Sequence, residues 1–199
     1  MPKKISVDVG KETTKVQHEV YSSSSSLTTL STKTLAEDLT ICEEWKLSID
    51  LKLPNGSITE WRNIFGLYVD KSTGQLDQRL LAVSITSDQS RVTLLIVYRI
   101  HTSKIYKYKM TKKVKSNNWI NLKVSQMKGV YEIKVDYKLV YNKSNLQKFA
   151  PTSRTNVKLV TGKVSGKPSG EENISIIVQY RNFKINTCKT TSKKLRLCF

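Results

Sequence analysis

Residues 45 to 53 read WKLSIDLKL, and they form the clearest strand pattern in the chain. Its large apolar side chains occupy every second position, which puts on one side Trp45, Leu47, Ile49, Leu51 and Leu53. The polar residues between them point the other way and are Lys46, Ser48, Asp50 and Lys52. Successive side chains of a β-strand point to opposite faces, so this alternation predicts a half-buried strand. The turn residues Pro54-Asn55-Gly56 end it.

Alternation with a period of two recurs along the chain, and no stretch of ten or more residues has helical periodicity. Near the N-terminus, short strands are predicted at residues 5–9 and 16–20, before the five serines from Ser22 to Ser26. Further strands are predicted at residues 63–69, 80–86, 92–100, 105–110, 119–126, 130–135, 139–142, 157–160 and 174–185. Many short strands separated by turn residues are typical of sandwiches. We therefore expect an all-β fold, a two-sheet antiparallel jelly-roll β-sandwich.

One hairpin is predicted from residues 132 to 142, which read EIKVDYKLVYN. A tight turn at Asp136-Tyr137 would pair Ile133 and Val135 with the strand that runs on to Tyr141. Two-residue turns of this kind can hold both central residues at positive φ, where Gly is preferred. Because Tyr137 stands there instead, we expect the turn to be strained.

A chain of 199 residues suits one sandwich domain and is long enough to bury most of its apolar surface. We expect N-terminal strands and the serine-rich connector at 1–26, the sandwich at 27–187 and a basic tail at 188–199. The longest strongly apolar run, LLIV, is far shorter than the ~20 residues that span a bilayer, so no transmembrane segment is expected. The first residues, MPKKISVDVG, lack the apolar run of a secretory signal, which indicates a cytosolic protein or a mature chain without its leader.

The order of these motifs resembles the laminin G-like and concanavalin-like jelly-roll superfamily. The strand with Trp45 is followed by WRNIFGLYV, RLLAVSI, WINLKVSQ, the hairpin YEIKVDYKLVYN and a closing YRNFKI. The similarity spans roughly residues 40 to 187 and consists of packing and turn residues, which carry fold more than function. It implies two curved antiparallel sheets and, by analogy, an extracellular module that binds glycans or proteins.

Two functional motifs of that superfamily are missing. Members that cleave β-glucans carry paired acids in a Glu-x-Asp-x-x-Glu arrangement, and retaining hydrolysis needs carboxyls ~5 Å apart. Glu132 and Asp136 share a strand face, but four residues at ~3.3 Å each separate their backbones by about 13 Å. The galactoside-binding His-x-Asn-x-Arg pattern is absent as well. We therefore expect a chain that is not an enzyme, with a divergent glycan-cleaving enzyme as a less favoured alternative.

No cofactor or metal is expected. The two histidines, His18 and His101, lie in different segments without a nearby cysteine or paired acids. Calcium needs six to eight oxygens, and the acids Asp70, Asp77 and Asp88 in or beside predicted loops do not show convergence.

The three cysteines, Cys42, Cys188 and Cys198, are too few for a disulfide framework and too scattered for a zinc site. Cys188 and Cys198 have a spacing that can close a small C-terminal loop, which would leave Cys42 buried or reactive. The spacing does not fix the redox state, so a bridged and an unbridged tail both stay open.

Charge is distributed unevenly along the chain. Residues 1 to 88 hold 10 Lys and Arg against 12 acids, whereas residues 89 to 199 hold 24 against only four. Residues 89 to 131 contain ten basic side chains and no acid. A folded surface with this imbalance has a strong positive field that concentrates polyanions. An acidic partner is therefore expected.

The basic side chains concentrate in one segment and in the tail. The first group contains Lys104, Lys107, Lys109, Lys112, Lys113 and Lys115. If residues 105–110 form a strand, Lys107 and Lys109 share one face while Tyr106 and Tyr108 occupy the other. TKKVKS, and SKKLRL with Lys193, Lys194 and Arg196, fit the x-B-B-x-B-x pattern associated with heparin-binding segments. Together these cations are the candidate polyanion-binding site.

We expect a binding or adhesion module that holds acidic or sulfated glycans on this lysine-rich face. Lysine ammonium groups are mobile point charges, which suits loose recognition of sulfate. The alternatives are a structural or matrix protein that binds an acidic protein partner through the sandwich surface, and a nucleic-acid binder that stacks bases on exposed rings. Nucleic acid is less favoured because alternation turns most of those rings inward. The resemblance favours an extracellular location.

Overall fold

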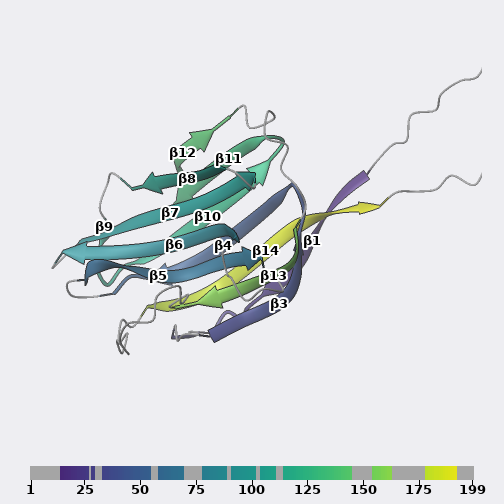
Figure 1. Cartoon of the computed structure of the whole chain (residues 1–199). Coiled ribbons are helices and arrows are strands. Elements are labelled where there is room, and N and C mark those ends of the chain that lie inside the picture. Colours follow the sequence, from purple (N-terminus) through teal and green to yellow (C-terminus); the bar gives the residue numbers. More distant parts are fainter. Residues whose placement is uncertain are drawn as a thin grey trace, which may run out of the picture.

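The stretch WKLSIDLKL forms the centre of a sheet in the computed structural model of the protein. It is strand β4 (Trp45–Lys52), which pairs antiparallel with β14 (Gln179–Thr191) on one side and β10 (Trp119–Met127) on the other (Figure 1). Its apolar side chains and that of Leu53 are at most 5% exposed. Complete burial of one such side chain contributes about 1.5–3 kcal/mol, so β4 anchors the core.

The structure describes residues 14–26, 28–29, 33–54, 58–69, 78–88, 91–101, 104–110, 114–144, 154–162 and 178–191. Their regular structure is entirely strand, and these ranges hold no helix with the length and apolar character needed to cross a membrane. The strand predicted at residues 5–9 lies outside them.

Two antiparallel sheets make up the sandwich, as Figure 1 shows. Sheet A has the order β1 (Thr14–Ser22), β14, β4, β10, β11 (Val130–Val135) and β12 (Lys138–Lys143), and the short β2 (Thr28–Thr29) pairs with β14. Sheet B has the order β3 (Lys33–Ile41), β13 (Arg154–Thr161), β5 (Ile58–Val69), β6 (Gln78–Asp88), β7 (Arg91–His101) and β8 (Lys104–Lys109), and β9 (Val114–Lys115) also pairs with β7. The predicted two-sheet antiparallel jelly-roll sandwich is confirmed.

Aromatic rings join the two sheets across the core. The rings of Phe65 on β5 and Phe183 on β14 have centroids 5.0 Å apart. The rings of Tyr98 on β7 and Tyr131 on β11 stack with centroids 3.6 Å apart. Such pairs contribute about 0.5–1.5 kcal/mol beyond the burial of their area. The inward residues of both sheets therefore meet in one continuous core.

Strand β3 has no counterpart among the strands predicted from the sequence. Its residues do not alternate cleanly, because Leu35 and Ala36 are adjacent and both pack against the core. Asp38 has a φ of 54°, and the register with β13 shifts along its length. These irregularities hide the period of two on which the strand predictions rest.

The first and last described strands pair with each other in sheet A. β1 runs along β14 from Thr14, opposite Thr191, to Ser22, opposite Lys184. The division into 1–26, 27–187 and 188–199 stays a prediction. Within sheet A, β1 precedes residue 27 and pairs with β14, which continues to Thr191.

The turn between β11 and β12 has the geometry that the sequence predicts. Asp136 and Tyr137 have φ values of 48° and 65°, so both adopt the left-handed conformation. This conformation costs a residue with a Cβ roughly 1–2 kcal/mol. The amide of Asp136 donates to the carbonyl of Asn121 at 2.9 Å, and the Asp136 carboxylate accepts from the Asn121 amide at 2.9 Å. These two hydrogen bonds hold the strained turn against β10.

Candidate anion-binding surfaces

Strand β8 presents two of the predicted lysines at one edge of sheet B. Lys107 and Lys109 are exposed on its outer face, which is the face turned away from sheet A. Tyr106 and Tyr108 alternate with them and pack, partly buried, against the core. The two residue types therefore occupy opposite faces of β8, as the alternation predicts.

Strand β9 extends this row of cations along the same edge. Both β8 and β9 pair with β7, where Lys109 lies opposite Leu95 and Lys115 lies opposite Arg91. Leu95 and Arg91 are an even number of residues apart, so the two lysines share the outer face, with about 13 Å between them at ~3.3 Å per residue. The exposed side chains of Lys107, Lys109, Lys115 and Arg91 form a line of positive charge that we call the β8 ridge.

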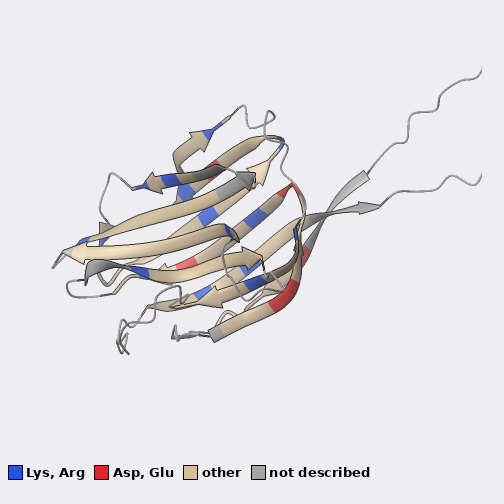
Figure 2. Ribbon diagram, viewed as in Figure 1, with Lys and Arg blue, Asp and Glu red and all other residues tan. Residues whose placement is uncertain are grey.

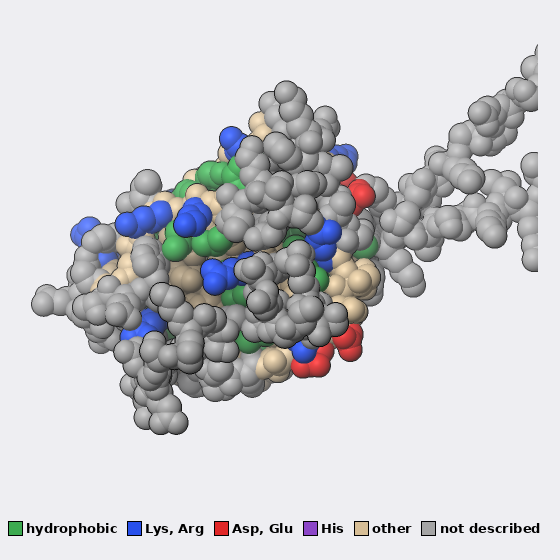
Figure 3. Space-filling model, viewed as in Figure 1, with side chains coloured by type: hydrophobic (Ala, Val, Ile, Leu, Met, Phe, Trp, Pro, Cys, Tyr) green, Lys and Arg blue, Asp and Glu red, His purple; other side chains and the backbone are tan. Residues whose placement is uncertain are grey.

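The described acids leave three cations of the β8 ridge without an ion pair. Within the described ranges, Lys107, Lys115 and Arg91 form no ion pair with a carboxylate. Figure 2 shows blue segments on β8 and no red one. In the space-filling view, blue side chains are spread over the visible face, with most of them in its left and upper parts, and red ones gather toward its right margin (Figure 3). The described part of this edge is therefore positively charged.

The other predicted lysines lie at or beyond the limits of the described ranges. Only the backbone of Lys104 is described, as the first residue of β8. The residues that lie outside the described ranges are Lys112, Lys113, Lys193, Lys194 and Arg196. Their place in a binding site stays a prediction. Conversely, sequence reasoning missed Arg91, because only the pairing of β9 with β7 puts it beside Lys115.

A second cationic surface, which sequence reasoning also missed, lies on the outer face of sheet A. Pairing of β4 with β10 places Lys46 opposite Ser125 and Ser48 opposite Lys123. A partly open groove of about 680 Å³ lies over these residues, and we call it the β4 groove. Its other polar lining residues are Lys128, Glu132, Lys134 and Asn186. The sequence did contain a signal for this surface. In each alternating strand the polar positions point outward, and in WKLSIDLKL these include Lys46 and Ser48.

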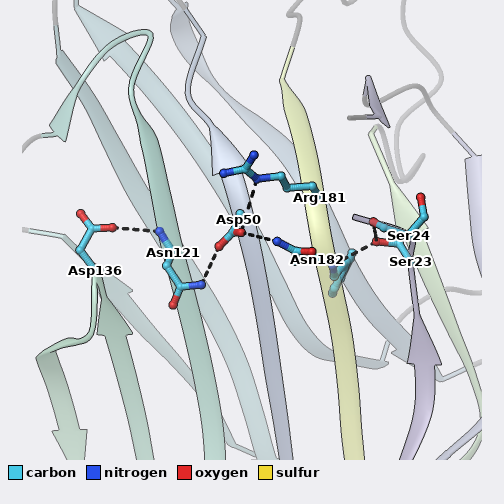
Figure 4. Close-up of polar contacts among 8 residues, drawn as sticks. Ser23, Ser24, Asp50, Asn121, Asp136, Arg181 and Asn182 are labelled. Carbon is cyan, nitrogen blue, oxygen red and sulfur yellow. Dashed lines mark hydrogen bonds and ion pairs between the residues drawn. The ribbon is translucent and has the colours of Figure 1, made fainter. Parts of the chain in front are cut away.

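The carboxylate of Asp50, on the same face, is engaged on both oxygens (Figure 4). One oxygen accepts a hydrogen bond from the side-chain Nδ2 of Asn121 at 2.7 Å, and the other accepts from the side-chain Nδ2 of Asn182 at 2.8 Å. The Nε of Arg181 lies 3.6 Å from that second oxygen, and its guanidinium lies 4.4 Å from the centroid of the Trp119 ring. This network links β10, β4 and β14 and compensates the charge of Asp50.

A tyrosine cluster fills the space between the sheets behind β8. The hydroxyls of Tyr98 and Tyr141 lie 2.9 Å apart, and the Tyr98 ring stacks on Tyr106 as well as on Tyr131. Burial raises the pKa of Tyr98 and of Tyr131 well above the ordinary value, so both stay protonated at neutral pH. The Tyr131 hydroxyl has no hydrogen-bond partner within the described part of the chain. Tyr98 and Tyr131 face the core and present no stacking platform for bases.

The described residues form no group of His, Cys, Asp and Glu that could hold a metal ion. Cys42 is a partly buried free thiol, and its amide donates to the Thr187 hydroxyl at 2.8 Å. Cys198, Asp70 and Asp77 lie outside the described residues. The closure of a C-terminal loop through Cys188 and Cys198 therefore stays a prediction.

Several solved structures share this fold. An alginate lyase from Alteromonas sp. 272 is 10% identical with a TM-score of 0.52, and the match covers 77% of this chain and 75% of that one. A heptameric SAP-like pentraxin from Limulus polyphemus is 11% identical with a TM-score of 0.52, over 76% of this chain and 67% of that one. Domain 4 of AbnA, a GH43 extracellular arabinanase from Geobacillus stearothermophilus in complex with arabinotriose, is 13% identical with a TM-score of 0.51, over 81% and 68%. No protein-family model and no curated protein sequence matches the chain.

These likenesses show the fold of the chain, a jelly-roll β-sandwich. The expectation that the chain is not an enzyme is wrong as an inference from the sequence, because an alginate lyase and a protein of polysaccharide lyase family 18 are built on the same sandwich. The missing pair of carboxyls excluded only hydrolysis of the paired-acid type. A lyase breaks its bond by elimination and does not depend on that pair, so its absence does not separate binding modules from enzymes in this fold.

Proposed function

We propose that this chain binds an acidic polysaccharide along the β8 ridge. The proposal rests on the placement of Lys107, Lys109, Lys115 and Arg91 on one face and at one edge of sheet B. Because strand pairing fixes these cations in a line, a linear polyanion lying along the edge meets several of them at once. Once one contact has formed the others are intramolecular, so individually weak contacts add up to useful affinity.

Two further observations support a glycan of acidic character. The sandwich is shared with an alginate lyase and with an arabinanase domain in complex with arabinotriose. The formal net charge of +18 favours an acidic polymer over a neutral one. The finer assignments belong to the same proposal: a laminin G-like module that recognises sulfated glycans outside the cell.

Salt dependence is the physical signature of such binding. Each ammonium group that contacts a polyanion releases condensed counterions, so affinity falls as salt rises, and the slope reports the number of contacts. A protein held mainly by hydrogen bonds or apolar contacts lacks that slope. Lysines on the β8 ridge act as separate point charges, so each contributes its own increment.

The test compares elution from immobilised heparin, from alginate and from a simple cation exchanger in salt gradients. The triple variant Lys107→Ser, Lys109→Ser, Lys115→Ser is expected to elute from heparin at clearly lower salt, and its salt slope is expected to fall by roughly one per lost contact. The matched control carries Lys52→Ser, Lys138→Ser and Lys143→Ser, which remove the same charge elsewhere. Equal shifts for both triple variants would show that only net charge matters and would overturn the proposal.

Three further measurements separate the competing functions. Ultraviolet absorbance of newly formed unsaturated ends detects elimination, and its appearance with alginate would add catalysis to binding. Retention on an acidic protein partner at high salt would favour a structural or matrix role. Equal retention on single-stranded DNA and on heparin of matched charge density would favour a nucleic-acid binder.

A further inference from the structure

The outer face of sheet A arranges polar side chains in two rows that cross four strands. One row runs through Lys184, Ser48, Lys123 and Lys134, and the other through Asn186, Lys46, Ser125 and Glu132. Neighbouring strands lie ~4.8 Å apart, and the rows are two residues apart along each strand, ~7 Å. At the centre, Lys46, Ser48, Lys123 and Ser125 occupy the corners of a small rectangle, in which ammonium groups and hydroxyls alternate. The face therefore offers charge and neutral hydrogen-bonding groups at short, fixed spacing.

Two cations at this centre are available to a ligand. Lys134 pairs with Glu132 at 3.1 Å, and Lys184 pairs with Glu19 at 3.9 Å. Within the described ranges, Lys46 and Lys123 form no ion pair with a carboxylate. They lie on one diagonal of the rectangle, at the ~7–8 Å typical of diagonal neighbours in a sheet. One anionic group between them can contact both ammonium groups.

Asp50, which lies on β4 two residues after Ser48, does not cancel the charge of Lys46 and Lys123. Asp50 is engaged by Asn121, Asn182 and Arg181, as Figure 4 shows. Beside the groove, the Lys123 ammonium lies 4.5 Å from the centroid of the Tyr137 ring, which is itself 72% exposed. The turn that carries Tyr137 thus sets an aromatic surface beside one of the available cations.

The volume and lining of the β4 groove suit a small ligand with both anionic groups and hydroxyls. Its volume of about 680 Å³ lies within the ~300–1,000 Å³ usual for small-molecule sites. Ser48, Ser125 and Asn186 can each donate and accept hydrogen bonds. Glu132 only accepts when ionised, so it suits a sugar hydroxyl and disfavours a bare anion. This combination separates the β4 groove from the β8 ridge, whose members are all cations.

We propose that the β4 groove is a second binding site, specific for a short acidic oligosaccharide. A carboxylate or sulfate group of the ligand lies between Lys46 and Lys123. Its hydroxyls bond to Ser48, Ser125 and the Glu132 carboxylate. This site lies on the opposite face of the sandwich from the β8 ridge and recognises a few sugar units, whereas the ridge holds a long chain.

Calorimetric titration with trigalacturonate, at moderate salt, tests the proposal on the full chain. The double variant Lys46→Ser, Lys123→Ser is expected to weaken binding by roughly tenfold to a hundredfold, because it removes two charged contacts. The matched control Lys138→Ser, Lys143→Ser removes the same charge from β12 and is expected to change affinity by less than about twofold. Both pairs are on the surface, and circular dichroism checks that each variant folds.

Three other outcomes would overturn the proposal. The first is equal weakening in both double variants, which would show attraction by net charge alone. The second is inorganic sulfate competing as well, per mole, as trigalacturonate, which would make the groove a simple anion site. The third is binding to phosphatidylserine vesicles without binding to the oligosaccharide, which would assign the face to a membrane. The heparin elution of the ridge variants is measured separately, so failure of the groove leaves the proposed function standing.

Discussion

The hydroxyl of Tyr131 is a buried polar group without a hydrogen-bond partner in the described part of the chain. Its ring is fully buried and stacks on Tyr98. Leaving such a group unsatisfied costs about 1–3 kcal/mol. Tyr131→Phe removes the hydroxyl and keeps the ring, so we expect the free energy of unfolding to rise by about 1 kcal/mol. Urea denaturation measures it, and calorimetry should show a rise in Tm of about 2–4 °C.

Tyr98→Phe is the matched control for this prediction. It leaves a ring in the same stack but removes the hydrogen bond between the Tyr98 and Tyr141 hydroxyls. We expect it to lower the free energy of unfolding by about 0.5–1.5 kcal/mol. If Tyr131→Phe destabilised the protein as much as Tyr98→Phe, the Tyr131 hydroxyl would have to be satisfied after all.

Which way a side chain points could be read from the sequence, whereas its neighbours could not. The opposite faces of Lys107 and Tyr106 follow from the period of two, which is a local property of any strand. Arg91 lies beside Lys115 only because β9 pairs with β7. Likewise, Lys46 and Ser125 meet only because β4 pairs with β10 in one particular register. The β8 ridge was therefore predicted in part, and the β4 groove was missed.

The β11–β12 hairpin keeps a strained residue where glycine would fit better. Tyr137 has a φ of 65°, which costs roughly 1–2 kcal/mol, while its contact with the Lys123 ammonium returns about 0.5–1 kcal/mol. Tyr137→Gly should therefore raise the free energy of unfolding by up to about 1 kcal/mol. It should also weaken trigalacturonate binding in the β4 groove, because Lys123 loses the ring beside its ammonium.

Denaturant unfolding and calorimetric titration of the same variant measure the two effects. Tyr137→Asn serves as the control, since asparagine tolerates the left-handed conformation and also lacks the ring. Both variants should gain stability and lose affinity together. A loss of stability in both, or unchanged affinity in both, would show that the ring is kept for another reason.

Strands could be predicted where one face is consistently apolar and the other consistently polar. β4 alternates large apolar and polar residues without interruption, and its apolar face is buried in the core between the two sheets. β3 alternates poorly, because a left-handed Asp38 and shifts in its register against β13 break the period. Repeated alternation was enough to predict the two-layered fold. It was not enough to predict β3, the irregular strand at one end of the described order of sheet B.

Across the whole molecule, cations lie on two opposite faces of one sandwich. The excess of basic residues after residue 88 predicts an acidic partner, but it does not say on which faces the charge gathers. Lys107 and Lys109 belong to sheet B, whereas Lys123 and Lys134 belong to sheet A, although one acid-free or acid-poor segment contains them all. The sequence also led to the wrong inference about catalysis, because packing residues define this fold and do not separate its binding modules from its lyases.

Binding of an acidic glycan at the β8 ridge is tested most directly by backbone NMR during titration with heparin-derived oligosaccharides. The amides of β8, β9 and the first residues of β7 should shift at low salt, and the shifts should fade as salt rises. Shifts spread evenly over both sheets, or concentrated on strands without the ridge cations, would contradict the proposed site.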